Sequence, residues 1–336
     1  MLKVFRYRVY PTKAQKSTMN NTLELCRWTY NETLALRKNA WESEQKNIGY
    51  YDSKKTIPIW KKEKPELKTV YSQVLQEVVK RVDLAFQAFF RRVKTGEKVG
   101  YPRFRGYGRY DSFTYTQSGF SLDSDRLTLS KIGDIKIKLH RPVEGEIKRL
   151  NVRKMPTGKW FVSFLVETDT PLELQKTGLS VGVDVGIKNF LTLSDGNYVP
   201  NPRFFVTEEK FLAKVQRKLS KLEKGTPERA KALKAVQRVY ERISNKREDF
   251  VQKVSLNLVR NYDLIIFEDL NIKGMIKNHK LAKHIADVTW NKLVTITSYK
   301  AEWAGKRVEL VNPCNTSQMC SGCGEIVKKE LSERIH

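Results

Sequence analysis

The chain has 336 residues, with 63 lysines and arginines against 37 aspartates and glutamates, a formal net charge of +26 and a pI near 9.8. Hydrophobic residues make up 40%, which argues against a disordered protein, and the length favours two or three domains. No apolar run approaches the roughly 20 residues of a membrane span and the N-terminus has no signal-peptide core, so the charge points to a polyanion, nucleic acid first, in a cytoplasmic setting.

The first hundred residues predict one strand followed by a helical lobe. Residues 2–11, LKVFRYRVYP, alternate in the manner of a half-buried strand, and Pro11 opens a segment through about Gln45 that is typical of a helix. A second helix is expected between Thr69 and Val93, where apolar residues recur every three or four positions. This stripe consists of Val70, Val74, Val78, Val82, Phe86, Phe89 and Val93. We expect the two helices to pack into one unit, residues 11–99, inserted after the first strand.

The composition changes at about Gly100. Residues 100–172 combine Gly, Pro and aromatic residues with short alternating runs such as RLTLS, IKIKLH and KWFVSFLVE. This pattern predicts a small β-barrel that also includes the N-terminal strand. A linker at about Pro171 to Gly178 follows.

Residues 178–312 predict a mixed α/β domain. A β-branched run at 180–185 is followed by a hairpin whose Asp195-Gly196 suits a tight turn. A long helix is expected after Thr207, with Glu208 in its first turn, and a second from Pro227 to about Tyr262. The strand DLIIFEDL, a helix from Asp287 to Ala304 and the strand RVELVNP complete the order. The whole chain is therefore predicted to be a multidomain α+β protein.

Two carboxylates end apolar strands of this third domain. Asp184 lies in VGVDVG and Glu268 in LIIFEDL. If the strands are neighbours, the carboxylates meet and form a site for hard divalent ions such as Mg²⁺, which can bridge a phosphodiester during hydrolysis. Each acid taken singly is more often a turn or capping residue. Their occurrence together in a strongly basic chain favours a catalytic metal site.

Residues 91–115 form a second candidate site, in which cations and aromatic residues alternate. Cations can follow phosphates while aromatic rings stack on bases, as in single-stranded nucleic acid and RNA binding. The alternative is that the aromatic residues are barrel core and the cations a solvated face. The predicted nucleic-acid-binding residues are Arg91, Arg92, Lys98, Arg103, Phe104, Arg105 and Arg109.

The four cysteines do not form the evenly spread framework of a secreted protein. Cys26 stands alone and is expected to be a small core residue. Cys320 and Cys323 have the spacing of one zinc knuckle, which supplies two of four ligands to a structural Zn²⁺. Cys314 and His336 could complete the site at an unusual spacing. A redox role for the CxxC pair is the alternative, although no thioredoxin-like setting surrounds it.

Three motifs in this order, VGVDVGIKNFLTLSDG, LIIFEDLNIKGM and TSQMCSGCG, resemble the TnpB/OrfB family of insertion sequences, relatives of the type V CRISPR effector nucleases. The resemblance covers nearly the whole chain, including FRYRVYPTKAQ and YPRFR. It implies a β-barrel wedge domain (1–10 and 100–172), a helical recognition lobe (11–99), a RuvC-like domain of RNase H fold (178–312) and a zinc ribbon, incomplete here (313–336).

The same resemblance implies binding of a guide RNA and of a double-stranded DNA target, and Mg²⁺-dependent cleavage in which Asp184 and Glu268 match the first two of three catalytic acids. The family pattern continues beyond His336 with a second CxxC and the third acid. We therefore expect this chain to bind nucleic acid but to cleave poorly.

Two other functions are weighed against an RNA-guided endonuclease. A nuclease-inactive RNA-guided DNA-binding regulator has no chemical need for Asp184 and Glu268. An actin-like sugar kinase would use VGVDVG as a phosphate loop, but no second phosphate motif or adenosine motif lies at a workable distance in the sequence.

Overall fold

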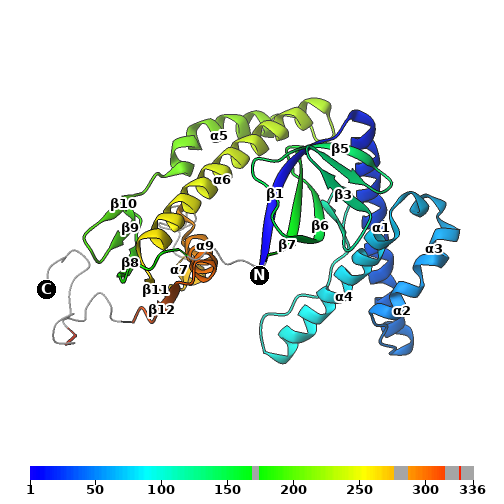
Figure 1. Ribbon diagram of the computed structural model, residues 1–336. Coiled ribbons are helices and arrows are strands. Elements are labelled where there is room, and N and C mark those ends of the chain that lie inside the picture. Colours follow the sequence, from blue (N-terminus) through cyan, green and yellow to red (C-terminus); the bar gives the residue numbers. More distant parts are fainter. Residues whose placement is uncertain (169–173, 276–286, 315–324, 327–336) are drawn as a thin grey trace. The chain divides into compact units, whose positions relative to one another are not determined.

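The computed structural model describes residues 1–168, 174–275, 287–314 and 325–326. The chain forms two units, residues 1–170 and 171–336, and each contains one sheet (Figure 1). The first sheet contains β1 (Leu2–Tyr10), β2 (Ser112–Tyr115), β3 (Phe120–Asp123), β4 (Arg126–Leu129), β5 (Gly133–Lys138), β6 (Glu146–Lys154) and β7 (Trp160–Glu167). The second contains β8 (Ser180–Val185), β9 (Asn189–Leu193), β10 (Tyr198–Pro200), β11 (Leu264–Glu268) and β12 (Arg307–Val311).

The helices of the first unit lie between β1 and β2 in the sequence. They are α1 (Lys13–Glu44), α2 (Tyr50–Lys55), α3 (Ile57–Glu63), the 3₁₀ helix η1 (Pro65–Thr69) and α4 (Ser72–Lys94). The second unit contains α5 (Phe204–Ser220), α6 (Pro227–Asn261), α7 (Ile272–Met275) and α9 (Trp290–Trp303). Within the described residues, none of these helices is both long enough and apolar enough to cross a membrane.

The first sheet is antiparallel, in the order β2-β6-β7-β1-β5-β4-β3, so the N-terminal strand joins the β-rich segment as predicted. The sheet is nearly closed, because side chains join its two edges. The Tyr115 ring on β2 lies 6.5 Å from the Phe120 ring on β3, and the Tyr115 hydroxyl donates to the Ser130 carbonyl over 2.8 Å. The barrel expected from the sequence is therefore an almost closed sheet.

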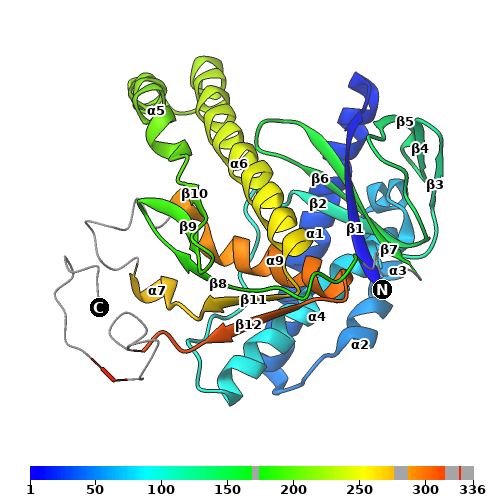
Figure 2. The same cartoon turned by 60° about the vertical axis from the view of Figure 1, so that its left-hand side comes forward.

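The two long helices of the first unit pack against each other and share one core with the sheet (Figure 2). Helix α1 begins at a capping box, in which the Thr12 hydroxyl accepts from the Gln15 amide and the Gln15 side chain accepts from the Thr12 amide. Inside, Arg37 and Asp83 form an ion pair of 3.0 Å with both side chains buried. Burial of this pair fixes α1 against α4.

The apolar stripe predicted for the second helix is correct as far as Phe86 and wrong at Val93. Val74, Val78 and Val82 are buried, whereas Val93 is 51% exposed because the last turns of α4 lie outside the core. The short helices α2 and α3 were not predicted. Six or seven residues carry too few apolar positions to establish a helical period.

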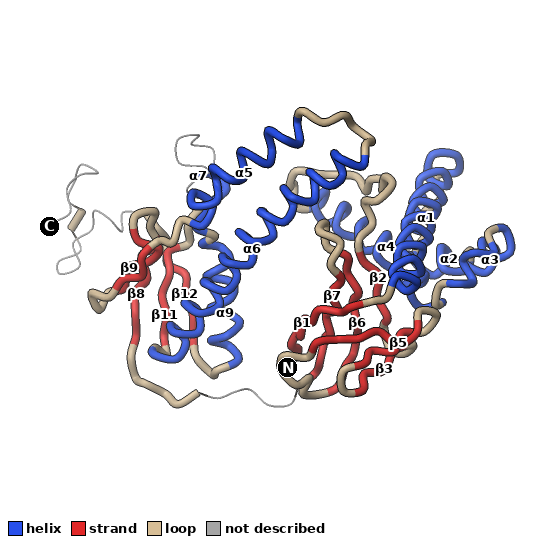
Figure 3. The backbone as a smooth tube through the Cα atoms, turned by 90° about the horizontal axis from the view of Figure 1, so that it is seen from above, coloured by secondary structure: helices blue, strands red, loops and turns tan. Residues whose placement is uncertain are grey.

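The second sheet has the order β10-β9-β8-β11-β12 (Figure 2), with β8, β11 and β12 parallel to one another and β9 antiparallel to both β8 and β10. Strands β8, β9, β11 and β12 are labelled beside one another in Figure 3. Its core contains Val181, Val183, Ile265 and Phe267 of the sheet, packed with residues of α6 and α9. Burying an aliphatic or aromatic side chain of this kind contributes about 1.5–3 kcal/mol. These contacts cover one face of the sheet, and the opposite face of β8 and β11 carries Asp184 and Glu268.

Two predicted helix starts were wrong, and both errors involve Asp287. Helix α5 begins at Phe204, not after Thr207, and α9 begins at Trp290, not at Asp287. The Asp287 carboxylate instead accepts from the Phe205 amide over 3.1 Å and from Arg247 Nε over 3.0 Å. Asp287 thus accepts a hydrogen bond from a free amide in the first turn of α5, at a residue 82 positions earlier in the chain. The second predicted helix is confirmed as α6.

Candidate functional site

Asp184 lies on the uncovered side of β8. Val181 and Val183 point into the core and are at most 4% exposed, so Gly182 and Asp184 lie on the other face. Asp184 is exposed and stands opposite Thr192 of β9. The strand alternation therefore presents this carboxylate to solvent.

Glu268 is the last residue of β11 and follows the same alternation. Ile265 and Phe267 are buried, which leaves Glu268 on the uncovered face opposite Val311 of β12. Strands β8 and β11 are parallel, with Phe267 opposite Val183. Asp184 follows Val183 and Glu268 follows Phe267, so the two acids occupy neighbouring positions on adjacent strands, whose backbones lie about 4.8 Å apart. The sequence prediction that these two acids meet is thereby supported by the register.

An open pocket of about 310 Å³ lies over the two carboxylates. Its lining includes Gly182, Thr192 and Ser194 besides the two acids. Gly182 has no side chain, and its amide donates to the Ser194 hydroxyl over 3.0 Å. The polar side-chain atoms of these lining residues are all oxygens, the donors preferred by Mg²⁺. Over the described residues, no group of three or more His, Cys, Asp and Glu side chains is arranged so that it could hold a metal ion.

The predicted nucleic-acid-binding residues lie at the end of α4 and in the segment that leads to β2. Arg91 and Arg92 are in the last turn of α4, and Lys98, Arg103, Phe104, Arg105 and Arg109 are exposed in that segment. The aromatic residues divide into two groups. Tyr101, Phe104 and Tyr107 are 45%, 53% and 85% exposed, whereas Tyr110, Phe113 and Tyr115 are core. The core interpretation is therefore correct for Tyr110, Phe113 and Tyr115, and nucleic-acid binding by the exposed rings stays a prediction.

Asn31 of α1 holds this basic segment in place. Its Oδ1 accepts from the Arg105 amide over 2.8 Å, and its Nδ2 donates to the Arg105 carbonyl over 3.0 Å. The Arg105 guanidinium lies 5.5 Å from the centre of the Tyr30 ring. Asn31 was not predicted from the sequence. Its low helix propensity in the middle of a long helix is the signal that could have indicated a special role.

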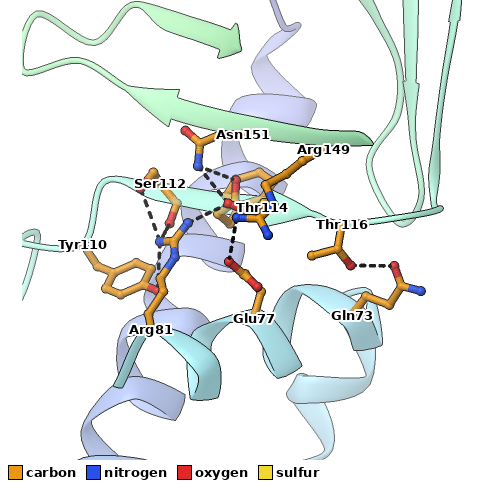
Figure 4. A network of polar contacts seen from close by, with 10 residues as sticks. Gln73, Glu77, Arg81, Tyr110, Ser112, Thr114, Thr116, Arg149 and Asn151 are labelled. Atoms are coloured by element: carbon orange, nitrogen blue, oxygen red, sulfur yellow. Dashed lines mark hydrogen bonds and ion pairs between the residues drawn. The ribbon is translucent and has the colours of Figure 1, made fainter. Parts of the chain in front are cut away.

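Arg81 of α4 is a second residue with a role that was not predicted from the sequence. Its guanidinium donates to the Tyr110 hydroxyl, the Ser112 carbonyl and the Thr114 hydroxyl over 3.2, 2.8 and 2.7 Å (Figure 4). Asn151 of β6 donates to the same Thr114 hydroxyl over 2.8 Å. These bonds join α4 to β2 and β6 and fix the direction of the Arg81 side chain.

The described cysteines differ in their surroundings. Cys26 is fully buried, as predicted, and burial raises the pKa of its thiol to about 12. Cys314 is exposed and its amide donates to Asn312 Oδ1 over 3.0 Å. Cys320, Cys323 and His336 lie outside the described residues, so the predicted zinc site stays a prediction.

Three family descriptions match parts of the chain. "Probable transposase" matches residues 163–279, which include both carboxylates. "Cas12f1-like, TNB domain" matches residues 290–336, and "Helix-turn-helix domain" matches residues 1–46. The last name does not describe the structure seen here, because residues 1–46 contain strand β1 and the single long helix α1.

Similar proteins extend over almost the whole chain. "Putative RNA-guided DNA endonuclease" of Streptomyces pristinaespiralis is 35% identical over 331 residues, which cover 96% of this chain and 81% of that protein. The chain belongs to the TnpB/OrfB family of RNA-guided DNA endonucleases. A second TnpB/OrfB relative, "Putative RNA-guided DNA endonuclease InsQ" of Escherichia coli K12, is 30% identical, and the matched residues cover 98% of this chain and 85% of that protein.

A solved structure shares the fold of this TnpB/OrfB protein. It is the cryo-EM structure of the Cas12f1-sgRNA-target DNA complex, with a TM-score of 0.59 over 94% of this chain and 76% of that one. The two sequences are 10% identical. The similarity therefore concerns the fold.

Proposed function

We propose that this TnpB/OrfB protein binds a guide RNA and a double-stranded DNA target and hydrolyses a DNA phosphodiester at Asp184 and Glu268. The observation that carries the proposal is the register of two parallel strands, which sets the two carboxylates side by side on an open face. The proposed partners are of the same kind as those of Cas12f1, which shares the fold and is in complex with an sgRNA and a target DNA.

We further propose that residues 178–312 have the RNase H-like fold of RuvC nucleases. The five-stranded mixed sheet supports this, since its neighbouring parallel strands β8 and β11 each carry an acid near the carboxyl end of the strand. The wedge domain (1–10 and 100–172) and recognition lobe (11–99) remain the proposed subdivision of the first unit.

The pocket fits a Mg²⁺ ion by the chemistry of its donors, two carboxylates with hydroxyl groups of Thr192 and Ser194 nearby. A bound ion would supply positive charge that stabilises the phosphodiester as negative charge builds up on its oxygens. Asp184 and Glu268 would hold that ion. The bare Gly182 and the open pocket leave room for the nucleic-acid backbone to approach.

Metal binding tests the carboxylate site without any need for cleavage. Mn²⁺ titration followed by electron paramagnetic resonance should show a site that both Asp184→Asn and Glu268→Gln weaken at least about tenfold, because each removes a charged ligand. Asp249→Asn, which changes an exposed carboxylate of α6 paired with Lys253, is the matched control. Equal Mn²⁺ affinity in all variants would contradict the proposed carboxylate site.

Cleavage itself is a separate measurement. The expectation that this 336-residue chain cleaves poorly stays a prediction, and a plasmid assay with guide RNA and Mg²⁺ tests it directly. Detectable guide-directed cleavage of the target would exclude the nuclease-inactive regulator.

We also propose a structural Zn²⁺ bound by Cys320 and Cys323, with Cys314 and His336 as further candidate ligands. The knuckle spacing supports it. Elemental analysis of the purified protein should find about one zinc per chain. A Cys320→Ser/Cys323→Ser variant should retain none, and an equal zinc content in both proteins would contradict the proposal.

A further inference from the structure

A second pocket, of about 220 Å³, lies in the first unit between α1, α4 and the segment that precedes β2. It is lined by Tyr30, Arg81, Arg105, Arg109, Tyr110 and Ser112, among others. Three guanidinium groups thus surround a volume bounded by two tyrosine rings that are at most 8% exposed. The carboxylate pair belongs to the other unit.

Arg81 forms the inner wall of this pocket, and its positive charge has no acidic partner among the described residues. Its hydrogen bonds go to neutral oxygens of Tyr110, Ser112 and Thr114 (Figure 4). This half-buried guanidinium, held by neutral acceptors, therefore lies in a setting of reduced solvation with its charge unpaired among the described residues. Such a group attracts an anion.

The charge of the remaining lining is also positive. Asp111 is the acid among the described lining residues, and its carboxylate is engaged by Arg153 Nε over 2.9 Å. Arg105 and Arg109 are exposed and form no ion pair with a described acid. The Arg109 amide donates to the Gly106 carbonyl over 3.0 Å, a turn that keeps both arginines beside the pocket.

We propose that this pocket binds one phosphate group of a nucleotide, clamped by Arg81, Arg105 and Arg109. The planar guanidinium fork matches phosphate oxygens in pairs. The volume exceeds that of a bare phosphate, and the apolar tyrosine rings suit the attached sugar or base. This inference rests on the proposed nucleic-acid binding and adds a subsite to it. The phosphate could come from a nucleic-acid backbone or from a free mononucleotide.

Binding of AMP, with adenosine as the phosphate-free probe, tests the subsite directly. We expect saturable broadening of the AMP phosphorus NMR signal by the full chain in the millimolar range, and no comparable binding of adenosine. Arg105→Gln/Arg109→Gln should weaken AMP binding at least about tenfold. Both side chains are exposed, so the variant should fold, which circular dichroism checks.

Lys13→Gln/Lys16→Gln is the matched control, since it removes the same charge from exposed positions of α1 about 20–25 Å from Tyr30 along the helix. It should leave AMP binding unchanged. The proposal is overturned if AMP does not bind saturably, if adenosine binds equally well, or if the two double variants behave alike.

A single-stranded RNA 20-mer distinguishes the two sources of the phosphate. Displacement of AMP by RNA identifies a backbone phosphate, and RNA binding without displacement identifies a free nucleotide; each outcome keeps the phosphate subsite. Failure of the chain to bind RNA at all would count against the proposed function, while AMP binding would still report on the pocket.

Discussion

Asp184 and Glu268 stand side by side because parallel strands β8 and β11 pair with Phe267 opposite Val183. Neither strand alone creates this relationship. The buried valines of β8 and the buried Ile265 and Phe267 of β11 fix which face each strand turns to the core, so both acids are left on the open face. A register shift of one residue would bury one carboxylate and separate the pair.

Removal of one carboxylate should abolish metal-dependent cleavage while nucleic-acid binding persists. Asp184→Ala or Glu268→Ala should reduce the weak cleavage expected of this chain to background, because the ligands act as a unit. RNA affinity, measured by fluorescence anisotropy, should change less than about twofold. Asp249→Asn serves as the control. A variant that cleaves at the wild-type rate would exclude these acids from catalysis.

Asn31→Ala should weaken RNA binding although it removes no positive charge. The change deletes both hydrogen bonds to the Arg105 backbone, each worth about 0.5–1.5 kcal/mol, and frees the basic segment. We expect a loss of about three- to tenfold in affinity with an unchanged dependence on salt, since the cations remain. Asn39→Ala, an exposed position of the same helix, is the control. A changed salt slope would mean that Asn31 acts in another way.

Loss of Asp83 should destabilise the first unit. Its side chain is 10% exposed and accepts from Arg37, Lys80 and Gln87 over 3.0, 3.2 and 2.8 Å. Asp83→Ala leaves the Arg37 charge buried without its partner, which costs about 3 kcal/mol in the free energy of unfolding. The double variant Arg37→Met/Asp83→Leu should recover most of that loss. Hydrogen exchange of the α1 and α4 amides measures the free energy of unfolding of the single and the double variant. A loss below about 1 kcal/mol in Asp83→Ala would contradict the prediction.

The stability of the second unit should fall in acid partly through Asp263. Its carboxylate accepts from the Thr177 and Gly178 amides over 2.9 and 2.7 Å and pairs with Lys306 over 3.1 Å, and these contacts lower its pKa to about 2 from the usual 3.8. A carboxyl whose pKa is lower in the folded state stabilises the fold above the unfolded pKa and loses this effect as the pH falls through the folded one.

The Asp263 contribution is therefore nearly complete above about pH 5, declines as the pH falls through 3.8 and is largely lost near pH 2. Asp263→Asn should be less stable than wild type at pH 5, with the difference closing by pH 2. Urea unfolding at pH 5, 4, 3 and 2 provides the measurement. A constant difference across this range would show that titration of Asp263 is not involved.

The candidate carboxylates and the basic segment could be predicted because each is marked by residues that are neighbours in the sequence. The apolar runs around Asp184 and Glu268 have the period and length of buried strands, so the positions of the two acids at strand ends could be predicted. The basic segment was found from its composition. In contrast, composition could not separate the buried Tyr110, Phe113 and Tyr115 from the exposed Tyr101, Phe104 and Tyr107, because burial depends on which rings pack into the core shared with α1 and α4.

The sequence by itself determined the strongly basic character of the protein, the main strands and long helices, and the motifs of the TnpB/OrfB family. Each of these depends on residues close together in the chain. Only the tertiary structure decided that Asp287 caps a helix 82 residues away, that Asn31 holds Arg105, and that Arg81 lies beside a pocket with no acidic partner among the described residues. These relationships join distant segments, and local periodicity carries no information about which distant polar groups will meet.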